Sequence, residues 1–270
     1  VRNLIKEKLK EDYIEKNLFK KDCSTNEVLK SISDLGFYNN LIITSENLNN
    51  IKNDILFKNT IFAFKGEKEN STNFYNNLTP NDNINKIISK SKNYKISHVG
   101  LELDLNQTKA IKQFACSKFF LEIAKSYLNS DDLTISGQCY ISNPFEISER
   151  EKKDNAQYFH YDLEFKKFFK VFIYLNNVDE FTGPHSFVKK SHRQKSFKHI
   201  LAERIDIEEV KRIYKSDGIK KFTGPEGSTI IEDTFGLHKG EVPQQDTRSM
   251  LILIYGLGEG IKDYSSFIRP

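Results

Sequence analysis

The chain lacks any long apolar run. Nowhere do its 270 residues approach the roughly 18 consecutive apolar residues of a membrane span. The charged start, VRNLIKEKLKEDYIEKNLFKKD, does not contain the apolar stretch of a secretory signal peptide. We therefore expect a cytoplasmic protein with no membrane partner.

Cysteine is scarce, and neither sign of charge dominates. Cys23, Cys116 and Cys139 are odd in number and far apart, which fits neither a disulfide framework nor a cysteine-type zinc site. We expect reduced thiols with structural roles. The 41 basic and 37 acidic residues leave a net charge of +4, which is too small to hold a nucleic-acid backbone by charge. No nucleic-acid partner is expected.

The first half of the sequence has mainly helical spacing of its apolar residues. The clearest helix is predicted over 24–36, where Ser24 and Glu27 form a capping box and Gly36 ends the helix. Further helices are predicted over 5–18, 45–56 and 108–129, and we expect the last of these to pack on the outside of a sheet.

Residues 65–95 interrupt this pattern, because they are rich in Asn, Lys and Ser. This composition predicts a long surface excursion with little contribution to a core. From about residue 133, short β-rich runs alternate with turn signals. Strands are predicted over 133–141, 156–162, 168–175, 227–233 and 249–257.

These runs predict an α+β fold, in which a jelly-roll or barrel-like double sheet is flanked by the N-terminal helices. There is no internal repeat and no clear linker, so one domain over 1–270 is the simplest description. Its helical part would span about 1–130 and its jelly-roll core about 131–258.

The run QYFHYDLEF contains two candidate metal ligands. On a β-strand, His160 and Asp162 share one face. A later segment supplies His238. Two imidazoles and one carboxylate on one face of a metal leave coordination positions open and suit Fe(II), whereas a closed structural zinc site needs a fourth protein ligand.

Arg248 follows His238 by ten residues. The intervening VPQQDT predicts a reversal of the chain, which would place His238 and Arg248 on neighbouring antiparallel strands. A guanidinium inside an apolar barrel needs an anion, and its planar fork matches a carboxylate. A dicarboxylate that binds the metal at one end could reach Arg248 with the other.

With these residues in place, residues 30 to 256 resemble the phytanoyl-CoA dioxygenase-like branch of the Fe(II)/2-oxoglutarate-dependent oxygenases. The matching segments are FHYD, KVFIYLNNVDEFTGPHSFVKKSHR and GSTIIEDTFGLHKGEVPQQDTRSMLILIYG. The resemblance implies that His160, Asp162 and His238 are catalytic iron ligands and that Arg248 binds the distal carboxylate of the cosubstrate 2-oxoglutarate. It also implies O2-dependent hydroxylation of a small organic substrate, with release of succinate and CO2.

The sequence departs from the family pattern at one turn, where Lys190 replaces a common Gly. Tyr158 and Phe172 are candidate pocket-wall residues. Asp162 argues against halogenation, since halogenases that resemble this family have Gly or Ala at that position.

The other histidines are given lesser roles. His185 is a candidate for the pocket mouth, and His192 is expected to hold the loop after Gly183. His98 and His199 have no evident partner and are expected to be structural or exposed.

Two other functions remain open. One is a cupin-like protein that binds a metal or small ligand without catalysis, against which Arg248 argues. The other is a zinc-dependent hydrolase, which would keep its activity without oxygen.

Overall fold

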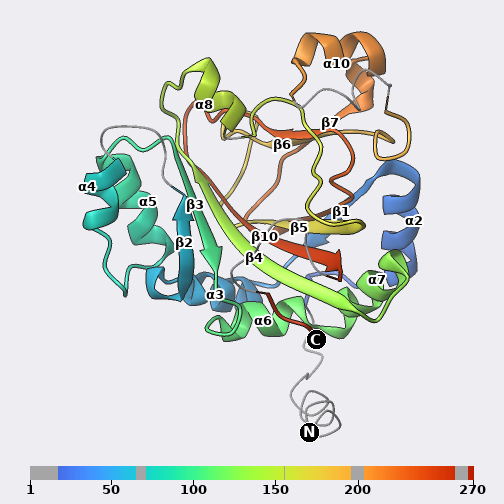
Figure 1. Cartoon of the computed structure of the whole chain (residues 1–270), viewed down its shortest axis with the longest axis horizontal. Helices are drawn as coiled ribbons and strands as arrows, with labels where there is room; N and C mark the ends of the chain where they lie inside the picture. Colours follow the sequence, from blue (N-terminus) through green and yellow to red (C-terminus); the bar gives the residue numbers. More distant parts are fainter. Residues whose placement is uncertain (1–17, 65–70, 155, 196–203, 259–266) are drawn as a thin grey trace, which may run out of the picture.

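Two antiparallel sheets face each other across the centre of the molecule (Figure 1). The computed structural model describes residues 18–64, 71–154, 156–195, 204–258 and 267–270. The large sheet contains, in order across it, β1 (Phe37–Ile42), β8 (Ser228–Glu232), β5 (Phe168–Tyr174), β10 (Arg248–Leu257), β4 (Leu133–Ser142), β3 (His98–Leu103) and β2 (Thr60–Phe64). The small sheet contains β7 (Ile219–Phe222), β6 (His185–Val188) and β9 (His238–Gly240). The predicted double sheet is confirmed.

The two faces of the large sheet belong to different cores, because successive residues of a strand point to opposite sides. On β10, Leu251 and Leu253 pack outward, while Met250 and Ile252 pack inward. The inward side chains join Phe187 of the small sheet in a second cluster. The space between the sheets is thus walled by side chains from both.

Helices cover the outer face of the large sheet, and all the described helices are too short or too polar to cross a membrane (Figure 1). Phe120 lies against Tyr255 of β10, with ring centroids 6.0 Å apart. Each buried side chain of this size contributes about 1.5–3 kcal/mol. The covering helices are α2 (Thr25–Leu35), α3 (Ser45–Asp54), α6 (Lys109–Ala115) and α7 (Lys118–Leu128).

The single long helix predicted over 108–129 is in fact two, since α6 ends at Ala115 and α7 begins after Ser117. The break lets Phe114 and Phe120 pack against each other with ring centroids 5.1 Å apart. Packing on the outside of a sheet is confirmed.

The N-terminal half contributes strands as well as helices. β1, β2 and β3 belong to the large sheet, although the sequence pattern there indicated mainly helix. β3 pairs with β4 over its whole length, from His98 to Leu103. Such pairing is a long-range contact that local periodicity does not reveal.

The expectation of a surface excursion over 65–95 was wrong for the residues that the structure describes. They form α4 (Ser71–Asn76) and α5 (Ile84–Asn93), with Phe74 and Ile87 fully buried. A few apolar residues at helical spacing were enough to pack, despite the polar composition. The predicted helix over 5–18 lies almost wholly outside the described residues. The remaining elements are η1 (Phe57–Asn59), α8 (Glu149–Asp154), α10 (Ile207–Tyr214) and η2 (Ser216–Gly218).

The ends of α2 are close to the sequence prediction. Ser24 caps the helix by accepting a hydrogen bond from the Asn26 amide at 3.2 Å, but Glu27 accepts from the Tyr38 hydroxyl instead of closing a capping box. Gly36 ends the helix at φ +95°, a left-handed conformation that favours glycine. A Cβ atom there would lie 2.6 Å from the Phe187 ring. The end of α2 therefore packs directly against the inner core at Gly36.

We predict that Gly36→Ala lowers the free energy of unfolding by about 2–4 kcal/mol, because it combines a left-handed alanine with overpacking against Phe187. Gly218→Ala is the matched control, since its new Cβ would come no closer than 3.4 Å to Tyr214. We expect the control to change stability by less than about 0.5 kcal/mol in urea unfolding. Equal effects of the two substitutions would contradict this account of Gly36.

Candidate metal centre

The segment that carries His160 and Asp162 is held by single backbone bridges. It was predicted as a strand, but His160 makes only an isolated bridge to His238, with reciprocal N–H to carbonyl hydrogen bonds of 3.0 and 2.9 Å. The Asp162 amide donates to the Thr234 carbonyl at 2.8 Å. These bonds attach the segment to the small sheet and to the loop before it.

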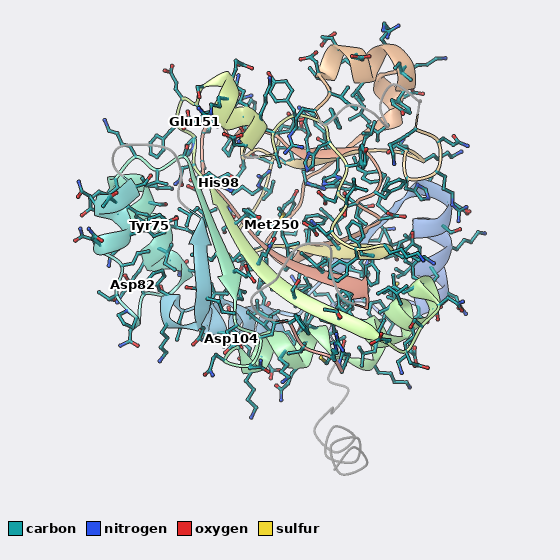
Figure 2. All side chains as sticks on the ribbon, in the orientation of Figure 1. Tyr75, Asp82, His98, Asp104, Glu151 and Met250 are labelled. Carbon is teal, nitrogen blue, oxygen red and sulfur yellow. The ribbon has the colours of Figure 1, made fainter. Side chains whose placement is uncertain are left out.

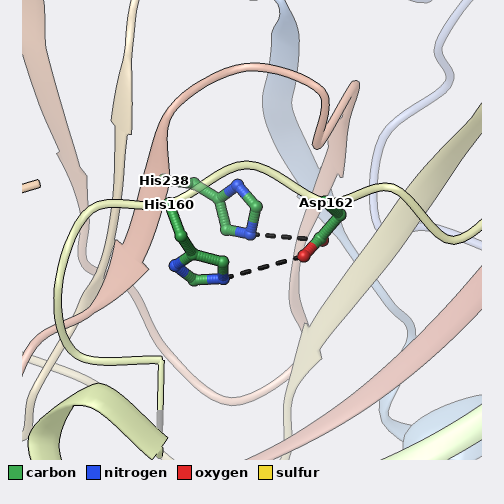
Figure 3. A group of neighbouring side chains, drawn as sticks. All are labelled: His160, Asp162 and His238. Atoms are coloured by element: carbon green, nitrogen blue, oxygen red, sulfur yellow. Dashed lines mark ion pairs between the residues drawn. The ribbon is translucent and has the colours of Figure 1, made fainter. Parts of the chain in front are cut away.

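Three predicted ligands converge at this bridge (Figure 3). His160, Asp162 and His238 present ligand atoms that all lie within 4.8 Å of one another. Nε2 of His238 is 3.3 Å from Oδ2 of Asp162, and Nε2 of His160 is 3.7 Å from Oδ1. Both imidazoles thus present Nε2 to the same carboxylate.

Backbone carbonyls fix both rings. Nδ1 of His160 is 2.9 Å from the Tyr158 carbonyl, and Nδ1 of His238 is 3.0 Å from the Gly236 carbonyl. A carbonyl only accepts, so each Nδ1 carries a proton, and a ring in its neutral form then has its lone pair at Nε2. This tautomer is the one that a metal bound at Nε2 requires.

The three residues fit a divalent cation. Oδ2 of Asp162 is buried and makes no well-aligned hydrogen bond within the described residues, although cationic groups lie close to it. Two neutral nitrogens and one carboxylate oxygen form a donor set that suits iron and leaves positions for further ligands. The three side chains are therefore suited to a metal by their chemistry as well as by their proximity.

Burial and mutual proximity set the charges of the three groups. Burial lowers the pKa of His160 to about 3, and His238 acts in the same direction. Burial also acts to lower the pKa of His238, but Asp162 outweighs it and raises that pKa. Burial acts to raise the pKa of Asp162, and Lys170 overcomes it, so the carboxylate is ionised. The site holds a fixed negative charge next to a neutral imidazole.

Lys170 is a buried cation beside this carboxylate. From the middle of β5 its Nζ reaches Oδ2 of Asp162 at 2.8 Å and Oε2 of Glu164 at 2.9 Å. A buried ammonium is costly unless it is paired, and here two carboxylates pair with it. Lys170 therefore connects the 160–164 segment to the large sheet.

A second buried pair lies on the other side of the triad. Nε2 of His185 is 3.0 and 3.1 Å from the two carboxylate oxygens of Glu232. The His185 ring stacks on Phe172 and lies 5.6 Å, centroid to centroid, from that of His238. Burial raises the pKa of Glu232 to about 8, so this carboxyl holds a proton at pH 7.

Arg248 faces the triad from the opposite sheet. His238 begins β9 of the small sheet and Arg248 begins β10 of the large sheet, so the expectation that they lie on neighbouring strands was wrong. Residues 241–247 cross between the sheets instead of forming a tight hairpin. A Cβ on Gly240 would nevertheless lie 2.7 Å from Nη2 of Arg248, so the two strands meet at this point.

A cavity of about 550 Å³ lies between the sheets and joins these groups. It is large enough for a small ligand. Arg248 is only 4% exposed and donates to the Gly183 carbonyl and to Ser142, and none of the described acidic side chains forms an ion pair with it. The lining includes His160, Asp162, His238, Arg248, Lys170, His185, Phe172, His98, Tyr140, Gln138, Met250 and Ile252.

The remaining sequence candidates have mixed outcomes. Phe172 lines the cavity as predicted, whereas Tyr158 donates to Glu149 of α8. His185 is buried and lines the cavity. His192 holds its loop by donating from Nε2 to the Ser33 carbonyl at 3.1 Å. His199 lies outside the described residues.

The turn at Lys190 is formed without glycine. Lys190 has φ +66°, so it adopts the left-handed conformation that Gly would favour. Its amide donates to the Leu35 carbonyl at 2.8 Å. The departure from the family pattern leaves the turn in a left-handed conformation.

Sequence reasoning missed Lys170, Glu164, Glu232 and His98. For Lys170 a signal was present: in FFKVFIY it is the only charge, and strand alternation puts it on the same face as Phe172, which was assigned to the pocket wall. Glu232 and His98 carry no such signal, because their partners come from distant strands.

No family model matches the chain, and none of the curated proteins matches it in sequence. The two sheets with their inner site define a jelly-roll protein, and solved structures share that fold. HygX from Streptomyces hygroscopicus, crystallised with nickel, 2-oxoglutarate and hygromycin B, is 12% identical, with 90% of this chain and 92% of HygX covered and a TM-score of 0.55.

Two further solved structures show the same likeness. EctD from S. alaskensis, crystallised with bound iron, is 12% identical, with 90% and 82% of the two chains covered and a TM-score of 0.52. SnoN, a non-heme alpha-ketoglutarate-dependent epimerase from nogalamycin biosynthesis, is 11% identical, with 86% and 82% covered and a TM-score of 0.54. At such identities the likeness establishes the fold.

We predict that Lys170→Met lowers the free energy of unfolding by about 3–5 kcal/mol at pH 7, because it leaves Asp162 and Glu164 buried without a cation. In the wild type, Lys170 holds the pKa of Asp162 well below its ordinary value. Without Lys170, burial raises that pKa instead. The carboxyl then takes up a proton on folding, so the loss of stability should shrink as the pH falls from 7 toward 4.

Lys221→Met is the matched control, because Lys221 of β7 forms an exposed ion pair with Glu180 at 3.7 Å. Urea unfolding should show a change below about 1 kcal/mol for this variant at every pH. A pH-independent loss in Lys170→Met would count against the charge explanation.

Proposed function

We propose that the protein is an Fe(II)- and 2-oxoglutarate-dependent oxygenase of the phytanoyl-CoA dioxygenase-like type, which hydroxylates a small organic substrate with O2 and releases succinate and CO2. In this proposal, His160, Asp162 and His238 hold the iron, Arg248 holds the distal carboxylate of 2-oxoglutarate, and residues 1–270 act as one domain. Because a jelly roll hosts many activities, the site has to carry this assignment and the fold cannot.

One observation carries the proposal. The Arg248 guanidinium has no acidic partner among the described residues, and it lies opposite three side chains that could bind a metal from one side. Three neutral or anionic ligand atoms converge on one side of the cavity, and Arg248 lies on the other side. A buried Arg without a carboxylate partner is costly unless an anion meets it. A ligand that binds a metal through one end and Arg248 through its other end satisfies both groups.

The charges inside the cavity agree with this pairing. Asp162 and Glu164 are balanced by Lys170 and Arg248, and Glu232 carries a proton at pH 7. A divalent cation alone would leave two uncompensated positive charges in a buried space. A divalent cation together with a dicarboxylate leaves none, which favours their joint binding.

The residues of the chain position and shield the reaction. Bound iron would supply the activation of O2, and 2-oxoglutarate the two further electrons. His160 and His238 are held by backbone carbonyls, so their Nε2 atoms keep their direction. Lys170 holds Asp162, and Phe172 contributes an apolar wall to the cavity.

The alternatives explain less. A non-catalytic binding module has little reason to bury Arg248 facing a metal site with open positions. A zinc hydrolase with three protein ligands fits the triad, but it leaves Arg248 without a role. The neighbours that were crystallised with 2-oxoglutarate or iron support the oxygenase through their fold.

We predict that His160→Ala lowers succinate formation from 2-oxoglutarate at least about 100-fold, because the two remaining ligands cannot hold the metal. The measurement is succinate released with Fe(II), 2-oxoglutarate, O2 and a panel of small metabolites as substrates. The variant should also lack the weak visible absorption band that an anaerobic Fe(II) and 2-oxoglutarate complex produces.

His192→Gln is the control, since His192 contacts α2 and not the cavity. It should keep the band and the succinate yield within about twofold. Full turnover by His160→Ala would defeat the ligand assignment, and activity with zinc in the absence of oxygen would favour the hydrolase.

A further inference from the structure

A row of three polar side chains crosses the large sheet at the Arg248 end of the cavity. In the strand register, Ser142 of β4 lies opposite Arg248 of β10 on one side and opposite His98 of β3 on the other. Figure 2 labels His98 and Met250, which come from β3 and β10 and line the same cavity. No role for His98 was evident from the sequence, and the proposed function has not used it.

Hydrogen-bond directions along this row are determined by chemistry. Arg248 can only donate, so at 3.2 Å from Nη2 the Ser142 oxygen accepts. The Ser142 hydroxyl proton then needs an acceptor, and Nδ1 of His98, 3.3 Å away, is the one that the described residues offer. Ser142 is almost fully buried, so a hydroxyl without an acceptor would be costly.

This arrangement fixes the tautomer of His98. Burial lowers the pKa of His98 to about 4, and Arg248 acts in the same direction, so the ring is neutral at pH 7. A neutral imidazole carries one proton, and with Nδ1 accepting, that proton is on Nε2. Nε2 makes no hydrogen bond to any residue in the described ranges, and the ring lines the cavity.

Arg248 cannot offer its whole fork to an anion. Nη1 donates to the Gly183 carbonyl and Nη2 to Ser142, so one N–H of each is already used. A carboxylate in front of Arg248 therefore has room for another donor. His98 is neutral, lines the same cavity, and has an Nε2–H group that makes no hydrogen bond within the described residues.

We propose that His98 is a second hydrogen-bond donor, through Nε2, to the distal carboxylate of 2-oxoglutarate. Ser142 serves as the positioning residue that keeps Nδ1 free of a proton. The inference rests on the proposed function, since it assigns a further residue to the cosubstrate site.

The test compares two 2-oxo acids in the anaerobic Fe(II) protein. 2-Oxoglutarate and 2-oxopentanoate share the group that binds the metal, but only the first has a distal carboxylate. The dissociation constants come from titration of the visible absorption band. His98→Phe keeps an aromatic ring against Tyr140. We expect it to raise the dissociation constant of 2-oxoglutarate about 10- to 100-fold and to change that of 2-oxopentanoate by less than about twofold.

The control variants separate binding from structure. His98→Gln retains an N–H donor and should lose less affinity for 2-oxoglutarate than His98→Phe. His192→Gln, away from the cavity, should change the dissociation constant of neither acid. Arg248→Met should reduce the preference for 2-oxoglutarate at least as much as His98→Phe, because it removes the charge.

Each outcome decides something different. If the wild type gives no band with either acid, the proposed function fails, and the role of His98 fails with it. If the wild type prefers 2-oxoglutarate and His98→Phe keeps that preference, only the role of His98 is overturned. If His98→Phe weakens the binding of both acids equally, His98 has a structural role, and its proposed role as a donor is also overturned.

A measurement on the wild-type protein guards against a variant that does not fold. In zinc-loaded protein labelled with 15N-histidine, we expect His98 to carry its proton on Nε2 and its signal to shift with 2-oxoglutarate but not with 2-oxopentanoate. A proton on Nδ1, or the same shift with both acids, would overturn the proposal.

Discussion

The site depends on the pair of backbone hydrogen bonds that joins His160 to His238. These bonds bring together two segments that are distant in the chain, one after α8 and one in the small sheet. Because both residues are held at their own amides and carbonyls, the side chains leave the bridge side by side. Their rings lie 4.3 Å apart, centroid to centroid. The bridge therefore sets the distance between two ligands before any metal is considered.

The large sheet supplies the polar and cationic side chains that face the bridged segment. Lys170, Ser142 and Arg248 come from the centre of the sheet, where β5, β10 and β4 are adjacent. Central strands are the most rigid part of such a fold, because every backbone group is paired on both sides. The Lys170 ammonium is thus fixed in position, while Asp162 and Glu164, the carboxylates that it meets, come from the irregular segment opposite. This division explains how a segment held by single bridges can present side chains in defined positions.

The jelly-roll topology also accounts for the polarity of the cavity. Opposing sheets turn alternate residues inward, and the cavity lining combines charged and hydrogen-bonding groups with the apolar side chains of Phe172, Met250 and Ile252. A ligand bound here would meet both fixed charges and apolar walls. Such a lining suits a small molecule that carries both charged and apolar groups.

Local periodicity and side-chain chemistry were enough to predict the strands at β4, β5, β8 and β10, the helix α2 with its ends, and the types of side chain that could bind a metal. The spacing of His160, Asp162, His238 and Arg248 also indicated that they are partners. Only the tertiary structure showed that His238 and Arg248 lie in opposite sheets. It also placed Lys170, His98 and Glu232 around the cavity between those sheets. Strand pairing and burial join residues far apart in the chain, and local patterns carry no information about which distant strand becomes the neighbour.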